Sequence, residues 1–435
     1  MTRLDAAGAF SLAVWTALTL LSHRPGPLPI AQFLLVQLAA WTGIVAALLL
    51  ARRPHRGRLL GRIWFWAVLF RLAGLLAQPV LEDDFYRYLW DGRALAMTGD
   101  PYTHAPAESF TELELPARFQ VILDRINYPL TPTIYGPVCE WAFGLAYWLA
   151  PGQLWSWKLI LLVADLAALG LLSRLLTPSQ VLLYAWCPLL IQETAFNAHP
   201  DSLGVFFLLA ALLVSLSGRW AGAALLLSLA TGVKVTGALL APLVLRRSGW
   251  KGWALFAAGL FSLYLPFLLR GASGGGAALA TFGSRWEFNS SAYAVMGWLL
   301  GPEIARPLCL ALVLAGCLWW VRHRPDGSPA LTGLVLYGGF FLLAPVVNPW
   351  YLLWLLPFAV WLPSPAAIVA MAVVTLSYVT GLNWPDASLG PYDHPYWLRW
   401  VEYGIVMVAI ASESFLRHRC LRLVRRKPIG QLDGT

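Results

Sequence analysis

Charged residues are scarce in this sequence. Asp, Glu, Lys and Arg make up 12% of its 435 residues, whereas hydrophobic residues make up 59% and the mean hydropathy is +0.64. A soluble protein carries about twice that share of charge, so a soluble enzyme is excluded. The short alternating segments of a membrane β-barrel are also absent. What is present is a series of apolar runs of roughly 17 to 25 residues, the length with which a helix crosses a bilayer.

These runs predict an all-α polytopic membrane protein of about 13 to 15 transmembrane helices, with residues 1–435 forming a single transmembrane domain. The candidate spans are residues 7–22, 30–51, 59–80, 134–150, 155–175, 179–196, 201–217, 220–245, 250–270, 303–321, 329–347, 349–363, 365–381 and 397–416. The first run follows a single basic residue, Arg3, and no clear small-residue cleavage site follows it. We therefore interpret 7–22 as a retained span and not as a signal peptide.

Cysteine is scarce as well, and it shows no pattern. The five cysteines lie in or beside apolar runs, with no CxxC or histidine-linked spacing. Neither a disulfide framework nor a zinc site is expected.

Basic residues predict the orientation, because they gather in cytoplasmic connections. The basic segments are 52–58, 246–251, 322–324 and the tail 417–435. Both termini should then be cytoplasmic, and the loop 81–130 should lie on the outer side. The net charge of +9 is the excess that this rule produces, together with attraction to anionic lipid, and it requires no nucleic-acid partner.

The loop 81–130 is the longest polar segment, and it holds nine of the 22 acidic residues. Three of them, Glu82, Asp83 and Asp84, follow directly after an apolar run. Long loops in compact proteins are usually functional or disordered, and the aromatic content of this one argues against disorder. We expect interfacial helices at 84–97 and 108–125, and a rigid, extended stretch at 127–132 because of its prolines.

Five strings occur in a fixed order: EDDFYRYLWDGRALAMTGDPY, NYPLTPTIYGP, NAHPDSLGVFFLLAALL, GVKVTGALLAPL and NPWYLLWLLPF. Together they resemble the C-type (GT-C) membrane glycosyltransferases, and among these the bacterial mannosyltransferases that use polyprenyl-phosphate mannose. The resemblance extends from residue 80 to about residue 360. Two spans precede the span that leads to the acidic loop, whereas many members of the family have one. The assignment of the first span is thereby open, but not that of the loop.

The resemblance implies an inverting transfer of a sugar, mannose by resemblance alone, from a polyprenyl phosphate to a lipid, glycan or protein acceptor outside the cytoplasm. An acid of the first outer loop deprotonates the acceptor hydroxyl in this family. Asp84 is the first candidate for the base, because Phe85 and Tyr86 follow it as in relatives. Asp83 is the alternative, or a partner that raises the pKa of Asp84. Three solvated loop acids are the structural alternative.

The candidate substrate-binding residues carry polar or aromatic side chains close to the expected outer surface. They are Glu82, Tyr86, Arg87, Arg93, His199, Asp201, Lys234, Arg285, Trp286 and Tyr351. Several of them have a structural alternative. Arg87 and Arg93 either contact phosphate or neutralise Glu82 and Asp91. Lys234 either reaches a lipid phosphate or snorkels.

Trp286 either stacks on a sugar ring or anchors the protein at the interface, and Tyr351 is expected in the pocket wall. Arg71 lies within a span and needs an interior partner, in a structural ion pair or near the site.

The position of the pair His199 and Asp201 is ambiguous. Counting five full crossings between the loop and residue 246 places His199 inside. If 179–196 fails to cross and 220–245 is a helix pair broken near Lys234, His199 lies outside and every basic connection stays inside. We favour the second topology. A simple capping turn with Asp201 at a helix N-terminus is the structural alternative.

No DxD-type nucleotide-sugar site, Walker motif, GxGxxG or GxSxG is present, which favours a lipid-linked donor. No cofactor is expected beyond this donor substrate. No metal ligand is assigned and the metal requirement is open, because scattered acids define no ligand geometry. The rival function is a membrane transporter or flippase, which would predict two symmetric halves. A ligase or polymerase of lipid-linked sugars usually carries its polar loop later in the chain.

Overall fold

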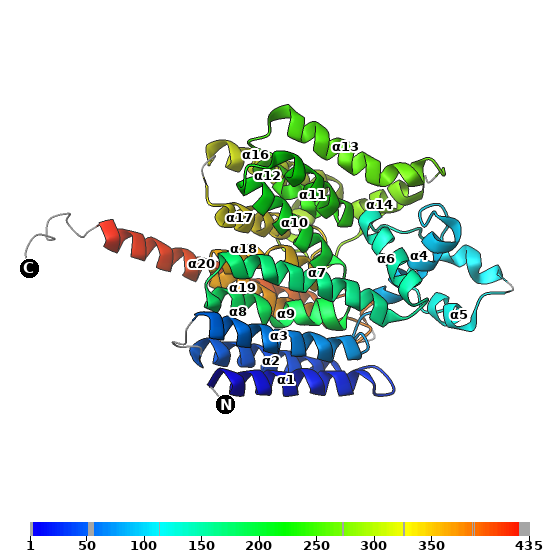
Figure 1. Cartoon of the computed structure of the whole chain (residues 1–435), viewed down its shortest axis with the longest axis horizontal. Helices are drawn as coiled ribbons and strands as arrows, with labels where there is room; N and C mark the ends of the chain where they lie inside the picture. The colour runs from blue at the N-terminus through cyan, green and yellow to red at the C-terminus, as the bar shows by residue number, and fades with distance from the viewer. Residues whose placement is uncertain are drawn as a thin grey trace, which may run out of the picture.

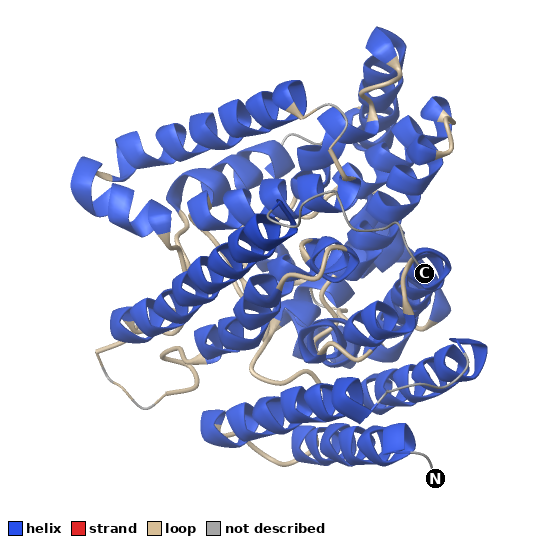
Figure 2. Ribbon diagram, turned by 90° about the vertical axis from the view of Figure 1, so that its left-hand side faces the viewer, coloured by secondary structure: helices blue, strands red, loops and turns tan. Residues whose placement is uncertain are grey.

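The computed structural model describes residues 3–50, 56–112, 114–271, 274–324, 327–384, 386 and 388–425. Helices account for the regular structure of this part of the chain, and the β-type pairing within it is a single bridge between Phe288 and Val346 (Figure 2). The expected all-α class is confirmed.

The helices of the first half are α1 (Arg3–Ser22), α2 (Ile30–Leu50), α3 (Arg56–Leu76), α4 (Asp84–Thr98), η1 (Pro106–Thr111), α5 (Ala117–Leu123), α6 (Pro137–Leu149), α7 (Leu154–Leu175), α8 (Pro178–Ala185), α9 (Pro188–Ile191), η2 (Gln192–Phe196) and α10 (Asp201–Leu216). Those of the second half are α11 (Trp220–Val233), η3 (Val235–Leu240), α12 (Ala241–Val244), α13 (Gly249–Leu268), α14 (Gly274–Arg285), α15 (Ala292–Leu300), α16 (Pro302–His323), α17 (Pro329–Leu343), η4 (Pro349–Trp354), α18 (Leu356–Trp361), α19 (Pro365–Val373), η5 (Val374–Tyr378) and α20 (Tyr396–Arg425).

Most long helices run along one direction of the molecule, and the loop helices gather at one end of them (Figure 1). The helices α4, α5 and α6 lie at this end, whereas the N-terminus and the end of α20 lie at the opposite end. Large apolar side chains such as Leu38, Trp250 and Trp298 are exposed on the outer faces, as expected where lipid covers a protein.

Five described helices are long and apolar enough to cross a membrane alone: α1, α2, α3, α13 and α16. The count rises to six if Pro188–Phe196 and Asp201–Leu216, bent by 118°, form one broken span. The other expected spans are shorter, interrupted or more highly charged helices, so uninterrupted helices do not by themselves give the expected 13 to 15 spans. Residues 51–55 and 426–435, in the basic connection and the basic tail, lie outside the described residues.

Contacts between α3, α7 and the segment 178–196 show the relative directions of these three elements. Trp64 of α3 donates to Ser173 near the end of α7, and Lys158 near the start of α7 donates to Gly74 O. The helices α3 and α7 are therefore antiparallel. Trp186 donates to Ile63 O, whereas Gly74 lies against Ala195. The segment 178–196 thus runs parallel to α3 and extends along most of its length.

The prediction that 179–196 fails to cross is therefore wrong. The short element is α6, whose 13 residues rise about 20 Å and which lies beside α4 at the loop end (Figure 1). Because α6 does not reach the other end, 178–196 returns to the loop side, and His199 lies there as expected. The expected helix pair at 220–245 is confirmed: α11 ends at Val233, and Gly237 folds back against Ala230.

Arg71 occupies the centre of this bundle and has a structural role. Its Nε atom lies 2.6 Å from Asp165 Oδ2, and its Nη1 atom donates to the carbonyl oxygens of Ala67 and Ala185. Both charged side chains are almost fully buried. This arrangement corresponds to the structural ion pair, one of the two alternatives for an intramembrane arginine.

Candidate active site

The acidic segment lies where the chain leaves α3 and enters α4. Leu81 has a left-handed backbone with φ 61°, so the chain turns sharply, and α4 then begins at Asp84. Carboxylates at a helix N-terminus are stabilised by the helix dipole. The expected helix at 84–97 is confirmed by α4, and its position at the membrane interface stays a prediction.

The rest of the loop differs from the expectation. The segment 108–125 is divided into η1 and α5, because Pro116 disfavours helix at the residue before it. The stretch 127–132 folds as a turn in which Thr131 N donates to Tyr128 O, and it is not extended.

Asn127, in this turn, joins the two aspartates. Its Nδ2 atom donates to Asp83 Oδ1 at 2.8 Å and to Asp84 Oδ1 at 2.7 Å. Tyr392 donates to the other oxygen of Asp83 at 3.3 Å. The second oxygen of Asp84 lies 3.5 Å from the hydroxyl of Tyr135. The carboxylates thus have fixed positions, and Asp84 keeps 23% of its side-chain surface exposed.

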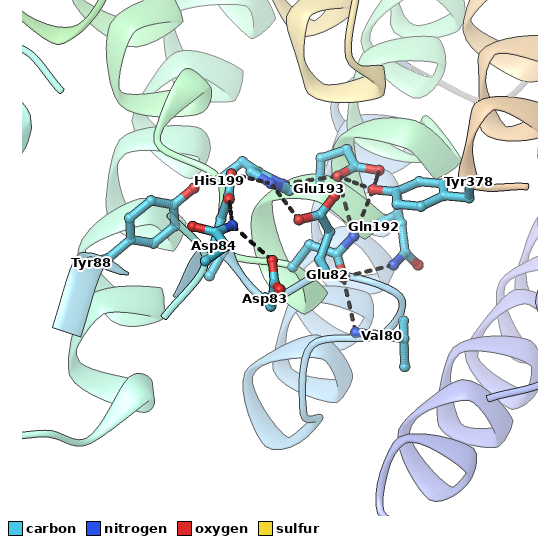
Figure 3. A network of polar contacts seen from close by, with 12 residues as sticks. Val80, Glu82, Asp83, Asp84, Tyr88, Gln192, Glu193, His199 and Tyr378 are labelled. Carbon is cyan, nitrogen blue, oxygen red and sulfur yellow. Dashed lines mark hydrogen bonds and ion pairs between the residues drawn. The ribbon is translucent and has the colours of Figure 1, made fainter. Parts of the chain in front are cut away.

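His199 lies against this acidic segment (Figure 3). Its Nε2 atom is 3.9 Å from Glu82 Oε2 and 3.9 Å from Asp84 Oδ2, and the residue is fully buried. The preceding Ala198 has φ 65°, a conformation that non-glycine residues adopt at a cost and that clusters at functional sites. The ring of Trp350 stacks on the imidazole with centroids 3.6 Å apart.

Buried polar residues also contact His199 on the side of the ring that faces away from Glu82 and Asp84. Its Nδ1 atom lies 3.0 Å from Glu193 Oε2, and its backbone N–H donates to Glu193 O. Tyr378 donates to Glu193 at 2.9 Å, and Asn197 donates to Glu193 at 3.3 Å. Glu193 belongs to η2, a π-helical turn of the kind that often occurs at functional sites.

The surroundings of Glu82 and Asp83 favour the protonated forms of these two carboxyl groups. Burial raises the pKa of Glu82 well above its usual value, and repulsion by Asp84 and Asp83 raises it further. Burial and then repulsion by Asp84 raise the pKa of Asp83, while the hydrogen bond from Asn127 opposes this shift. No described lysine or arginine lies within ion-pair distance of these acids.

A separate polar pair follows His199 along the chain. Lys234 Nζ lies 2.8 Å from Asp201 Oδ1 and 3.6 Å from the centre of the Tyr351 ring. Trp354 also donates to Asp201, at 2.6 Å. Lys234 keeps 23% of its side-chain surface exposed, whereas Asp201 is fully buried. The structure thus brings three of the predicted residues together: Asp201, Lys234 and Tyr351.

The loop arginines lie in structural contacts. Arg87 pairs with Asp91 at 3.0 Å and donates to Thr131 O, and Arg93 pairs with Glu112 at 3.1 Å. The ion-pair alternative describes both side chains better than a phosphate contact, although neither of them neutralises Glu82. Tyr86 accepts a hydrogen bond from Arg125 at 2.8 Å.

Among the described residues, the segment 282–289, which contains Arg285 and Trp286, contacts the site through aromatic rings. Trp286 lies 4.4 Å from the ring of Tyr128, which in turn lies 5.6 Å from the ring of Tyr392. Since Tyr392 contacts Asp83, these three rings form a rim beside the acids. Arg285 is exposed at the end of α14 and is not brought to the acids by a described contact.

No functional role was predicted for Asn127, Glu193, Tyr378 or Tyr392. Glu193 could have been recognised, because an ionisable residue within an apolar run is a functional candidate. No feature of the sequence around the other three residues indicates their role.

Comparison with known proteins decides the family. Residues 7–247, more than half of the chain, match the model described as "Alpha-(1->6)-mannopyranosyltransferase, N-terminal domain". The chain belongs to this family. The resemblance to polyprenyl-phosphate-mannose-dependent GT-C enzymes is thereby confirmed, and the membership favours a glycosyltransferase over a transporter.

The curated relatives of this chain are distant but cover most of its length. It is similar to Alpha-(1->6)-mannopyranosyltransferase A of Mycobacterium tuberculosis, at 24% identity over 87% of this chain and 80% of the relative. A polyprenol-phosphate-mannose-dependent alpha-(1-2)-phosphatidylinositol pentamannoside mannosyltransferase of the same species is 23% identical, over 78% of this chain and 84% of the relative. A probable alpha-(1->6)-mannopyranosyltransferase of Mycolicibacterium smegmatis is 24% identical, over 86% of this chain and 76% of the relative. No solved structure matches the chain significantly.

Proposed function

We propose that this protein transfers mannose from a polyprenyl-phosphate donor to a hydroxyl group of a glycan, glycolipid or protein acceptor, with inversion at the anomeric carbon. The name of one relative supports the donor, since it describes a polyprenol-phosphate-mannose-dependent enzyme. The observation that carries the proposal is the position of Asp84: a fixed, partly exposed carboxylate where the acidic loop meets the helical bundle.

Asp84 acts as the general base in this proposal. The carboxylate takes the proton of the acceptor hydroxyl as the hydroxyl oxygen bonds to the anomeric carbon. The bond between that carbon and the phosphate oxygen breaks, and its electron pair leaves with the polyprenyl phosphate. Proton transfer to a positioned carboxylate accelerates such steps by about 10² to 10⁴. Asp83 shares Asn127 with Asp84 and orients it, or receives the proton in its place.

Lys234 is proposed to bind the phosphate of the donor and of the leaving group. Fixed positive charge at a leaving phosphate stabilises the transition state. Lys234 is suited to this role because it is partly exposed and is held by Asp201 over the Tyr351 ring. The rim of Tyr128, Tyr392 and Trp286 supplies aromatic faces for sugars.

We propose that the reaction takes place on the extracytoplasmic side of the cell membrane. The acidic loop lies at the end of the molecule opposite to the start of α1 and the end of α20 (Figure 1). The excess of basic residues in the tail predicts that the chain ends are cytoplasmic.

The test is incubation of the purified full-length protein with radiolabelled polyprenyl-phosphate mannose and, in parallel, with the glucose and galactose analogues. The proposal expects consumption of the mannosyl donor and release of polyprenyl phosphate when membrane glycolipid is added as acceptor. Consumption of another sugar donor alone would overturn the assignment of mannose, and consumption of none would overturn the donor class.

A further inference from the structure

Three groups that bind metal ions converge in the candidate active site. One oxygen of Glu82, one oxygen of Asp84 and one nitrogen of His199 all lie within 4.8 Å of one another. Both carboxylate oxygens are 3.9 Å from His199 Nε2. Ligand atoms bound about 2.0 to 2.2 Å from one ion lie about 3 to 4 Å apart. Small side-chain movements are therefore enough for the three atoms to share an ion.

The imidazole is aimed at this point with a nitrogen that has no hydrogen-bond partner. His199 is fully buried, and neither ring nitrogen makes a hydrogen bond within the described chain; Nδ1 lies 3.0 Å from Glu193 Oε2, whereas Nε2 faces the two carboxylates at 3.9 Å. A buried polar nitrogen without a partner is costly. The same nitrogen faces two carboxylates that keep 16% and 23% of their side-chain surface exposed, which gives an ion a route from solvent.

The opposite side of the imidazole has the arrangement that commonly orients a metal-binding histidine. A carboxylate next to the other ring nitrogen fixes the tautomer and raises the basicity of the ligand. Glu193 lies 3.0 Å from Nδ1 and is itself held by Tyr378 and Asn197. The Trp350 ring, stacked on the imidazole, restricts its rotation.

The excess of negative charge around His199 also favours a bound cation. Glu82, Asp84 and Glu193 are gathered around one histidine, and within the described part of the chain His199 is the only basic side chain that forms an ion pair with any of them. A divalent cation between Glu82 and Asp84 would offset this concentration of negative charge.

We propose that Glu82, Asp84 and His199 bind one divalent cation of the Mn²⁺ or Zn²⁺ class. Two carboxylates and an imidazole suit these ions better than Ca²⁺, which prefers oxygen ligands alone. Cation binding does not depend on the proposed transfer reaction; only its role there, to bind the acceptor hydroxyl beside Asp84, rests on that function.

The test is direct binding of Mn²⁺ to the purified, chelator-treated full-length protein in lipid nanodiscs, followed by the electron paramagnetic resonance signal of free Mn²⁺. The wild-type protein should bind one equivalent, and added Zn²⁺ should displace it. Glu82→Gln and His199→Gln should each weaken binding at least about tenfold.

Two matched variants serve as controls. Glu112→Gln removes an acid of the same loop that pairs with Arg93, and His104→Gln removes an exposed histidine that pairs with Glu108. Both should bind Mn²⁺ as the wild type does. If His199→Gln fails to fold, as judged by gel filtration and thermal melting, Glu82→Gln decides.

Absence of binding to the wild type, or equal binding by Glu82→Gln and Glu112→Gln, would overturn the proposal and leave His199 as an ion-pair partner of the acids. Because the readout is the metal itself, a failed cation site is distinguishable from a failed transferase assignment.

Discussion

The Nδ1 atom of His199 lies 3.0 Å from Glu193 Oε2, and both side chains are fully buried. This contact joins the turn after η2 to the acidic segment before α4, since the opposite ring nitrogen faces Glu82 and Asp84. The position of the imidazole, and with it the geometry around Asp84, depends on a carboxylate that does not itself face the proposed substrate site.

Glu193→Gln tests this dependence. The amide keeps the shape of the side chain but no longer fixes the charge and tautomer of His199, so we expect the transfer rate to fall by about tenfold to a hundredfold with little change in donor KM. Tyr378→Phe removes one hydrogen bond to Glu193 and should have a smaller effect of the same kind. Steady-state kinetics at matched levels of folded protein measure both, and a rate for Glu193→Gln equal to the wild type would contradict the positioning role.

Asn127→Ala should move the acidic limb of the pH–rate profile to higher pH. The hydrogen bond from Asn127 opposes the burial and the repulsion by Asp84 that raise the pKa of Asp83. Without this bond the pKa of Asp83 rises further, so the carboxylate takes up its proton at a higher pH as the solution is acidified. The less active form, with Asp83 protonated, is therefore reached at a higher pH than in the wild type. Transfer rates measured between pH 4.5 and 8 decide the sign; an unchanged or lower midpoint would show that Asn127 does not favour the ionised pair.

Lys234→Met should raise the KM for the lipid-linked donor by about tenfold or more, since a hydrogen bond to a charged group contributes about 1.5 to 3 kcal/mol. Lys234→Arg should retain part of the binding because the charge remains. Lys251→Met, an exposed lysine at the start of α13, is the matched control and should behave as the wild type does. A donor KM for Lys234→Met equal to that of the control would place the phosphate elsewhere.

Arg71→Met should destabilise the protein by about 3 to 5 kcal/mol, because it leaves Asp165 buried without its partner. The double variant Arg71→Met with Asp165→Leu removes both charges and should recover much of the loss. Thermal melting of the two variants in the same detergent measures the difference. Equal melting of Arg71→Met and the wild type would refute a stabilising ion pair.

Local sequence features predicted the parts of the site that depend on neighbouring residues. Three acids after an apolar run placed Asp84 at the start of a helix, and the break before Lys234 predicted the return of the chain at that point. The side on which His199 lies was also predicted, although for the wrong reason, because α6 and not 179–196 is the short element. A 13-residue helix and a crossing helix have similar apolar composition, so hydropathy does not separate them.

Contacts between segments that are far apart in the sequence could not be predicted from local sequence features. Glu193 and Tyr378 are 185 residues apart, and Asp83 and Tyr392 are 309 residues apart. Nothing in the composition of either segment indicates these pairs, because they follow from how the helices pack. Arg87 shows the reverse case: an i,i+4 carboxylate, Asp91, was visible in the sequence and accounts for its position without a phosphate.

The base role of Asp84 is tested most directly by the transfer rate of purified Asp84→Asn, compared with Asp83→Asn and with Asp124→Asn, an exposed aspartate of the same loop whose carboxylate bonds only Gln120 among the described side chains. We expect Asp84→Asn to lower the rate at least about a hundredfold without loss of folded protein, Asp83→Asn to lower it less, and Asp124→Asn to leave it within about twofold of the wild type. Wild-type transfer by both Asp84→Asn and Asp83→Asn would contradict the account.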